Sequence, residues 1–108
     1  MELMQLQMLV AVAEERTLQK AAARVFRTPQ AISTAIGKLK EEIGTPLLDR
    51  TPGRDFRMTP AGEALVNYAR RLLSLRDEAL ATMGEIRNAR SGNLRIGANQ
   101  SVGEYLLP

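Results

Sequence analysis

The chain contains neither cysteine nor histidine. The absence of cysteine excludes disulfides, thiol redox chemistry and cysteine zinc ligands, and the absence of histidine removes the usual general base. The remaining hydroxyl side chains therefore have no imidazole to activate them as nucleophiles. No cluster of carboxylates suggests a metal site either. We expect no enzyme activity, no catalytic residue, no metal and no cofactor.

Long hydrophobic runs are also missing. No segment approaches the roughly 20 apolar residues that cross a bilayer, and the N-terminus lacks the order of basic, apolar and small residues of a signal peptide. Hydrophobic residues still make up 44% of the 108 residues, enough for a small core. We therefore expect a folded cytoplasmic protein without a membrane segment.

Positive charge is concentrated in one segment of a chain whose net charge is only +3. No aspartate or glutamate occurs between Arg16 and Lys40, whereas acidic pairs stand on either side of this window. The basic residues in the window are Arg16, Lys20, Arg24, Arg27, Lys38 and Lys40. A surface that faces DNA explains such a window, and an ordinary solvated basic face is the alternative.

Helical spacing of apolar residues predicts a first helix from about Glu2 to Glu14 and a short second helix after Thr17, which is suited to cap it. The apolar stripe of the first helix is Leu3, Leu6, Leu9, Val10 and Ala13. The stripe of the second helix is Leu18, Ala21, Ala22 and Val25. The paired alanines allow another helix to approach closely.

Thr28-Pro29 predicts the start of a third helix, because a hydroxyl caps a helix and proline is favoured at its first position. Gly44 is suited to end this helix in the left-handed conformation. The predicted buried stripe is Ile32, Ala35, Ile36, Leu39 and Ile43. The residues predicted to face outward are Gln30, Ser33, Thr34, Gly37, Lys38 and Glu41.

Two helices joined by a very short turn are typical of a helix-turn-helix, whose second helix lies in the major groove of DNA with its N-terminal residues nearest the bases. Gln30 can pair bidentately with adenine, and Ala31 offers a methyl contact for thymine. The predicted base contacts are Thr28, Gln30, Ala31, Ser33, Thr34 and Lys38. The predicted phosphate contacts from the helices are Arg24, Arg27 and Lys40, with Lys38 also able to act there.

Gly37 lies in the interior of the predicted recognition helix, where glycine costs about 1 kcal/mol relative to alanine. Close approach of the helix to another molecule is one explanation. Neutral drift is the other.

Two short segments with apolar residues, Pro46 to Arg50 and Phe56 to Met58, flank a stretch rich in turn-forming residues and predict a small β-hairpin, or wing. Arg50, Arg54 and Arg57 place positive charge on this wing, toward the neighbouring DNA backbone or the minor groove. Ordinary solvation is the alternative for each arginine taken alone.

Thr59-Pro60 predicts the start of a long helix that runs to about Asn88. At 1.5 Å per residue this helix is about 40 Å long, more than one small domain covers. We expect a second copy of the helix to cover the apolar stripe, and a helix packed on its own domain throughout is the alternative. The predicted dimer contacts are Leu65, Ala69, Leu72, Arg76, Ala79, Met83 and Ile86.

After a helix-breaking Ser91-Gly92-Asn93, residues 94–98 alternate as a strand with one buried face. The tail has too few apolar residues for its own core, so we expect it to be the truncated start of a further domain. The predicted organisation is a mainly α fold. Residues 1–59 form a winged helix-turn-helix, residues 60–90 form a linker or dimerisation helix, and residues 91–108 form a hinge with the start of the next domain.

These elements together resemble the N-terminal domain of LysR-type transcriptional regulators, over nearly the whole chain. The resemblance is carried by Ala21-Ala22, Thr28-Pro29-Gln30-Ala31-Ile32-Ser33, Leu39, Gly44-Thr45-Pro46-Leu47-Leu48-Asp49-Arg50 and Met58-Thr59-Pro60-Ala61-Gly62. It implies a linker helix that dimerises antiparallel and a C-terminal sensor domain, resembling periplasmic binding proteins, that binds a small-molecule effector in the full-length protein and promotes tetramers. Residues 94–97 resemble the first strand of that domain, and Ser101 matches an effector-binding hydroxyl whose site is incomplete here.

Several positions depart from the pattern of that family. The order Pro29-Gln30 reverses the usual Gln-Pro, and Thr34 stands where an arginine often contacts guanine. Lys40 stands where the family has a glutamate and Arg27 where it has an apolar residue, so these two add positive charge for binding the DNA backbone. Leu48 stands where the family has a phenylalanine. The departures leave the operator sequence open.

The sequence thus predicts a sequence-specific DNA-binding transcription regulator that binds an inverted-repeat operator as a homodimer. The alternative is a winged-helix module for protein association, with the long helix as its working surface. Such a module needs no acid-free basic window, which favours the DNA-binding hypothesis.

Overall fold

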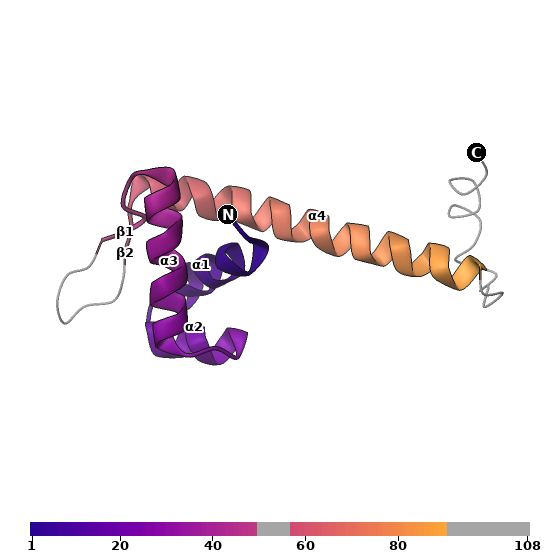
Figure 1. Ribbon diagram of the computed structural model, residues 1–108, viewed down its shortest axis with the longest axis horizontal. Coiled ribbons are helices and arrows are strands. Elements are labelled where there is room, and N and C mark those ends of the chain that lie inside the picture. Colours follow the sequence, from indigo (N-terminus) through magenta and orange to yellow (C-terminus); the bar gives the residue numbers. More distant parts are fainter. Residues whose placement is uncertain (50–56, 91–108) are drawn as a thin grey trace. The chain divides into compact units, whose positions relative to one another are not determined.

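The computed structural model describes residues 1–49 and 57–90. These residues form four helices and two short strands (Figure 1). In chain order the elements are α1 (Leu3–Glu15), α2 (Leu18–Val25), α3 (Pro29–Ile43), β1 (Leu48–Asp49), β2 (Arg57–Met58) and α4 (Pro60–Arg90). The mainly α fold with a small hairpin predicted from the sequence is confirmed. The predictions for Arg50, Arg54, the strand at 94–98 and Ser101 lie outside the described residues.

The helix boundaries follow from local capping chemistry. The Thr17 hydroxyl accepts a hydrogen bond from the Lys20 amide at 3.2 Å, and the Thr28 hydroxyl accepts one from the Ala31 amide at 3.1 Å. Pro29 occupies the first turn of α3, and Gly44 ends that helix with a φ of 85°, in the left-handed region. These predicted caps are confirmed.

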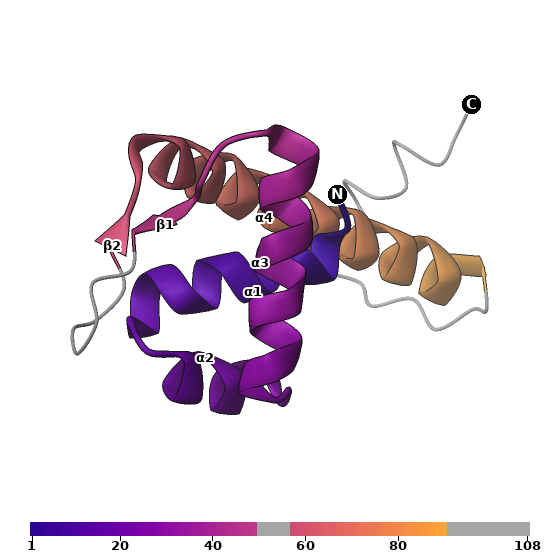
Figure 2. The same ribbon diagram turned by 60° about the vertical axis from the view of Figure 1, so that its left-hand side comes forward.

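Helices α1, α2 and α3 pack on one another. Helix α3 lies across α1, and its N-terminal end is next to α2 (Figure 2). Ala21 and Ala22 are buried, which confirms the predicted close approach at α2. Helix α1 is buried more completely than a single stripe predicts, because Met8, Ala11 and Val12 are also in the core. The first fourteen residues of α4 belong to the same compact unit, which spans Met1–Leu73.

Two residues of the predicted apolar stripes are exposed, and Ala13, Leu18 and Val25 are half-buried. Leu3 at the start of α1 is 41% exposed, and Ile43 at the end of α3 is 40% exposed. Both stand in the terminal turn of their helix, beyond the part that its neighbours cover. Periodicity therefore predicted the correct face but extended it too far along each helix.

The two strands form an antiparallel pair with Leu48 opposite Met58 and Asp49 opposite Arg57. Thr59 joins this pair to the start of α4. Its amide donates to the Leu47 carbonyl at 3.1 Å, and its hydroxyl donates to the Pro46 carbonyl at 2.7 Å and accepts from the Gly62 amide at 3.0 Å. One threonine therefore caps α4 and ties it to the segment that precedes β1.

Gly62 lies against the same segment. A Cβ atom at this position would collide with the Leu47 carbonyl oxygen and would lie 2.8 Å from the Met58 methyl carbon. Carbonyl oxygens of the backbone cannot rotate away as a flexible side chain does. Close packing of α4 on the chain before β1 therefore requires glycine at position 62.

A cluster of ion pairs links α1, α2 and α4. The Glu14 carboxylate accepts from the Arg24 guanidinium at 2.5 Å and from the Arg70 guanidinium at 3.1 Å, and Arg24 also reaches Glu15 at 3.3 Å. The hydrogen bond from Arg24 lowers the pKa of Glu14 and Arg70 lowers it further, against an opposing effect of burial. The same pairing with Glu14 raises the pKa of Arg24.

Residues 74–90 of α4 belong to a second unit, of which the structure describes the helical part. None of the helices in the described ranges is apolar over enough of its length to cross a membrane. The predicted end of the long helix at about Asn88 agrees with the observed end at Arg90. The domain boundaries at residues 59 and 90 remain predictions.

The Gly62→Ala substitution is expected to lower the free energy of unfolding by about 1–3 kcal/mol, because the added methyl group displaces backbone. Urea denaturation measures the change. Gly37→Ala is the matched control, since nothing lies within 4 Å of a Cβ at that helical position. The control is expected to raise the unfolding free energy, and a Gly62→Ala protein as stable as that control would contradict the packing described for position 62.

The Glu14→Gln substitution is expected to lower stability at pH 7 by about 0.5–1 kcal/mol, a small value because the paired side chains are partly exposed. The lowered pKa of Glu14 means that its carboxylate stabilises the folded state above its ordinary pKa of 4.5, and that this contribution is lost as the pH falls through the lowered value. Unfolding of both proteins between pH 7 and pH 3 should show the difference shrinking toward acid pH. A difference that stays constant with pH would exclude the ion pairs as its cause.

Candidate nucleic-acid interface

Helix α3 has one face in the core and one in solvent. Ile32, Ala35, Ile36 and Leu39 are buried, and Ile32 and Leu39 have no exposed surface. The exposed side chains on the opposite face are Gln30, Thr34, Lys38 and Glu41. The core contacts therefore fix the orientation of α3, and its polar side chains are left available for a partner.

Five of the predicted base contacts line one shallow groove between α3 and the start of α1. From α3 and its cap, the groove is lined by Thr28, Gln30, Ala31, Thr34 and Lys38, together with Ala35. From α1 and the residue before it come Glu2, Met4, Gln5 and Met8. The groove has a volume of about 440 Å³. The Thr28 hydroxyl is engaged as the cap of α3 but keeps a proton to donate.

The contribution of α1 to this groove was missed in the sequence. Met4 is 38% exposed and so lies outside the buried part of α1. The only sequence signal was its position off the predicted apolar stripe of the first helix. Which residues of another helix meet that side depends on tertiary packing, and a periodicity does not report it.

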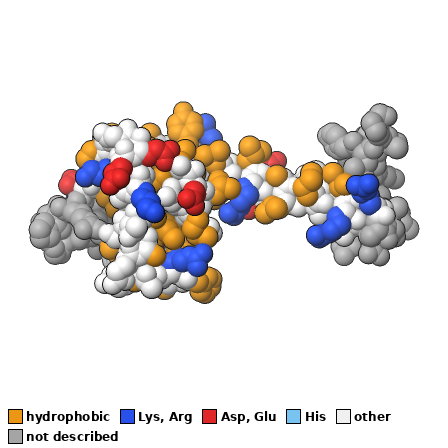
Figure 3. All heavy atoms as spheres, in the orientation of Figure 1, with side chains coloured by type: hydrophobic (Ala, Val, Ile, Leu, Met, Phe, Trp, Pro, Cys, Tyr) orange, Lys and Arg blue, Asp and Glu red, His pale blue; other side chains and the backbone are white. Residues whose placement is uncertain are grey.

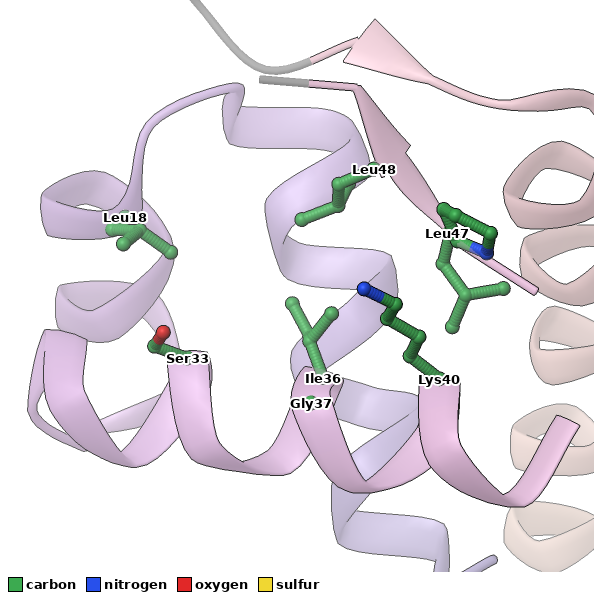
Figure 4. A pocket seen from close by; sticks show the side chains of 8 residues that line it. Leu18, Ser33, Ile36, Gly37, Lys40, Leu47 and Leu48 are labelled. Carbon is green, nitrogen blue, oxygen red and sulfur yellow. The ribbon is translucent and has the colours of Figure 1, made fainter. Parts of the chain in front are cut away.

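The sixth predicted base contact, Ser33, lies on the other side of α3. It lines a hollow of about 290 Å³ with Ile36, Gly37 and Lys40 from the same helix. The opposite wall comes from Leu18 of α2 and from Pro46, Leu47 and Leu48 (Figure 4). The Lys40 side chain extends along this hollow toward the β1 residues (Figure 4). The predicted contacts are thus divided between two sides of one helix.

Charge on this surface differs in one respect from the acid-free window of the sequence. Glu14 and Glu15 precede the acid-free window in the sequence, but in the folded chain they pair with Arg24. The charge of this one basic residue of the window is therefore neutralised. Within residues 1–49 and 57–90, no ion pair engages Arg27, Lys38 or Lys40, and all three are exposed. These three carry the positive charge that remains beside α3.

The turn that precedes α3 presents a further feature that sequence reasoning missed. Phe26 ends α2 in the left-handed conformation with a φ of 57°, and its side chain is 89% exposed. The Arg27 amide donates to the Ala22 carbonyl at 2.9 Å and closes the turn. An aromatic and a basic side chain therefore stand next to the N-terminal end of α3. On the wing, Arg57 is exposed on β2.

Along α4, the predicted dimer contacts do not all lie on an exposed surface. Ala69 is fully buried in the core of its own chain, and Leu65 packs against that core. Arg76 pairs with Asp77 at 3.0 Å. Because these three positions turn toward the domain or carry charge, the apolar stripe of α4 keeps the other four predicted residues and adds two new ones.

The apolar stripe of α4 consists of six residues at helical steps of three and four. Five are exposed and Ile86 is half-buried; the six are Tyr68, Leu72, Leu75, Ala79, Met83 and Ile86. Tyr68, Leu75 and Met83 are 59%, 61% and 57% exposed, although large apolar side chains are normally covered. Hydrophobic side chains are visible along α4 in Figure 3. Tyr68 and Leu75 were not among the predicted contacts.

Residues 3–63 match the family model described as bacterial regulatory helix-turn-helix protein, lysR family. A probable RuBisCO transcriptional regulator of Trichormus variabilis is 37% identical over 104 residues, which cover 96% of this chain and 31% of that protein. The chain spans about a third of the length of the curated relatives it matches.

Solved structures agree with this match. The BenM_DBD/benA site 1 DNA complex is 37% identical with a TM-score of 0.75, over 81% of this chain and 97% of the other. The CbnR_DBD-DNA complex is 32% identical with a TM-score of 0.71, over 84% of this chain and 99% of the other. Both the fold and the sequence therefore confirm the resemblance found in the residues, and the chain belongs to the lysR family of bacterial regulatory helix-turn-helix proteins.

Proposed function

We propose that this chain is the DNA-binding part of a transcription regulator that binds an inverted-repeat operator as a homodimer. The observation that carries the proposal is the outward face of α3, where Gln30, Thr34 and Lys38 are exposed on a helix whose opposite face is held by the core. A helix of about 10–12 Å in diameter fits the major groove of B-DNA, which is about 12 Å wide. The similar BenM and CbnR domains were solved in complexes with DNA.

In this function the residues divide into those that read bases and those that bind phosphates. Gln30 donates one hydrogen bond to an adenine and accepts another from it. Hydroxyl groups for hydrogen bonds with neighbouring bases come from Thr28, Ser33 and Thr34, and Ala31 offers a methyl group for an apolar contact. Lys38 can reach either a base or a phosphate of the DNA. Arg27, Lys40 and Arg57 bind phosphates, and Arg50 and Arg54 join them from the wing.

Arg24 has a smaller part in binding than the sequence predicted. Its guanidinium lies 2.5 Å from Glu14 and 3.3 Å from Glu15, and these contacts must break or rearrange before it reaches a phosphate. We therefore assign Arg24 to the support of α2 and not to the first contacts with DNA.

A second copy of the chain covers the apolar stripe of α4. A pair related by twofold symmetry buries the same stripe on both copies with one self-complementary contact. Two α3 helices held in this way meet two half-sites related by the same symmetry, which is why the operator is an inverted repeat. We propose that the protein acts in the cytoplasm and that its role there is regulatory and not catalytic, which its membership of a family of bacterial regulatory proteins supports. The small-molecule effector, with Ser101 in its site, belongs to the full-length protein.

The alternative is a module for protein association in which α4 is the working surface. Its support is the same exposed stripe, centred on Tyr68, Leu75 and Met83. That hypothesis leaves the unpaired cations beside α3 without a role. Selection of DNA sequences separates the two functions, because only a DNA reader enriches a motif.

Selection from a random-sequence duplex library is expected to enrich an inverted repeat with the wild-type chain. Repeating the selection with Gln30→Ala should remove the preference at one base position of each half-site, because a bidentate contact contributes about 1–3 kcal/mol of discrimination. The readout is the enriched motif, followed by titration of the selected and scrambled duplexes. No enriched motif from the wild-type chain would overturn the proposed function.

Lys40→Ala serves as the matched control for Gln30→Ala. Loss of one phosphate contact should weaken the selected and scrambled duplexes equally and reduce the slope of log K against log salt by about 0.9. If Gln30→Ala instead weakened both duplexes equally and left the motif unchanged, Gln30 would not be a base reader.

Leu75→Glu is expected to convert the dimer to a folded monomer, because a buried carboxylate in the paired stripe is unfavourable whereas the exposed side chain contributes little to the core of one chain. Leu80→Glu is the control: Leu80 is 64% exposed on the same helix but lies off the stripe. Sedimentation velocity gives the oligomeric state of both proteins. Equal dissociation of the two variants would contradict the stripe as the dimer contact.

A further inference from the structure

Gly37 occupies the middle of the outward face of α3. At 3.6 residues per turn, Leu39 lies about 200° further around the helix, nearly opposite Gly37. Leu39 has no exposed surface, so the direction in which Gly37 points is away from the core. The exposed side chains of Gln30, Thr34 and Lys38 lie to one side of this direction, at about 20°, 60° and 100° around the helix. The residue without a side chain is thus placed where α3 faces its proposed partner.

Nothing in the described part of the chain requires glycine at this position. A Cβ atom added to Gly37 meets no atom within 4 Å, unlike one added to Gly62. Gly37 also lies within a regular helix, whereas Gly44 has a φ of 85° that other residues rarely adopt. Within the described residues, neither packing nor backbone conformation therefore requires glycine at position 37, and the surface there is open to close approach by another molecule.

The surface beside Gly37 combines a hollow, a cation and apolar side chains. Gly37 opens onto the hollow of about 290 Å³ that Ser33 and Lys40 also line (Figure 4). The other wall of the hollow is aliphatic, from Leu18, Leu47 and Leu48. A cation next to apolar walls fits the edge of a nucleic acid strand, which alternates phosphates with deoxyribose and carries thymine methyl groups at the bases.

We infer that the main chain of α3 at Gly37 contacts DNA directly, and that the absence of a side chain there sets how deeply α3 enters the major groove. Gly37 is then a positioning residue. It lets Gln30 and Thr34 reach the base edges while Lys40 reaches a phosphate. The inference rests on the proposed function and goes beyond it, because a larger residue at position 37 holds the whole helix away from the bases.

The test is a series of two substitutions, Gly37→Ala and Gly37→Leu, in the complete 108-residue chain. Both are good helix formers, so the melting temperature should rise, by about 4–8 °C for alanine. Affinity for the duplex selected by the wild-type chain should fall at least tenfold with alanine, about 1.4 kcal/mol. It should fall further with leucine. Stability and affinity thus move in opposite directions, which a purely structural role for Gly37 does not produce.

Gly84→Ala is the matched control for Gly37→Ala. It places a methyl group within α4 where nothing lies within 4 Å, so any general effect of replacing a helical glycine appears there too. The control is expected to bind the selected duplex as the wild-type chain does. An equal loss of affinity in Gly84→Ala, or a Gly37→Ala protein that binds within twofold of the wild-type chain, would overturn the inference and leave the proposed function intact. A wild-type chain that selects no duplex would overturn the proposed function and the inference with it.

Discussion

The close packing of α4 on the segment before β1 is the constraint on which the domain depends. Gly62 brings the first turn of α4 against the Leu47 carbonyl, and Thr59 bonds to both Pro46 and Leu47. The C-terminal end of α3, the strand pair and the start of α4 therefore converge on a few backbone atoms. With this junction in place, Val66 and Ala69 of α4 reach the core that the three preceding helices form.

Ion pairs also stabilise the arrangement of the helices, and they contribute less to stability than this junction because their side chains are partly exposed. Glu14 is held by arginines from two other helices, so one carboxylate stabilises the arrangement of α1, α2 and α4. The same contact takes Arg24 out of the set of free cations. Arg27 in the turn before α3 and Lys38 and Lys40 on α3 remain exposed, and no ion pair engages them in the described residues. Positive charge is thereby kept next to the proposed base readers.

Local chemistry made much of the fold predictable. A threonine before a helix, a proline in its first turn and a glycine after its last turn fix boundaries through atoms only a few residues apart, and Thr17, Thr28 and Gly44 act in this way. Leu3 and Ile43 were assigned wrongly because burial depends on where a neighbouring element begins and ends. The burial of Ala69 and the pairing of Arg24 with Glu14 and Glu15 could not be predicted for a related reason, since they form only after the helices pack. In the candidate site, the outward face of α3 followed from periodicity, but its division between a groove and a hollow did not.

The separation between the two faces of α3 has a consequence for how such a protein diverges. The side chains that hold the helix in place, Ile32 and Leu39 among them, are different from those that meet solvent. After gene duplication, one copy can therefore exchange Gln30 or Thr34 without losing its core, and so acquire a new operator while remaining folded. Residues that serve both stability and recognition would oppose such change. New regulatory circuits can then arise from the same domain by a few substitutions on a single helix face.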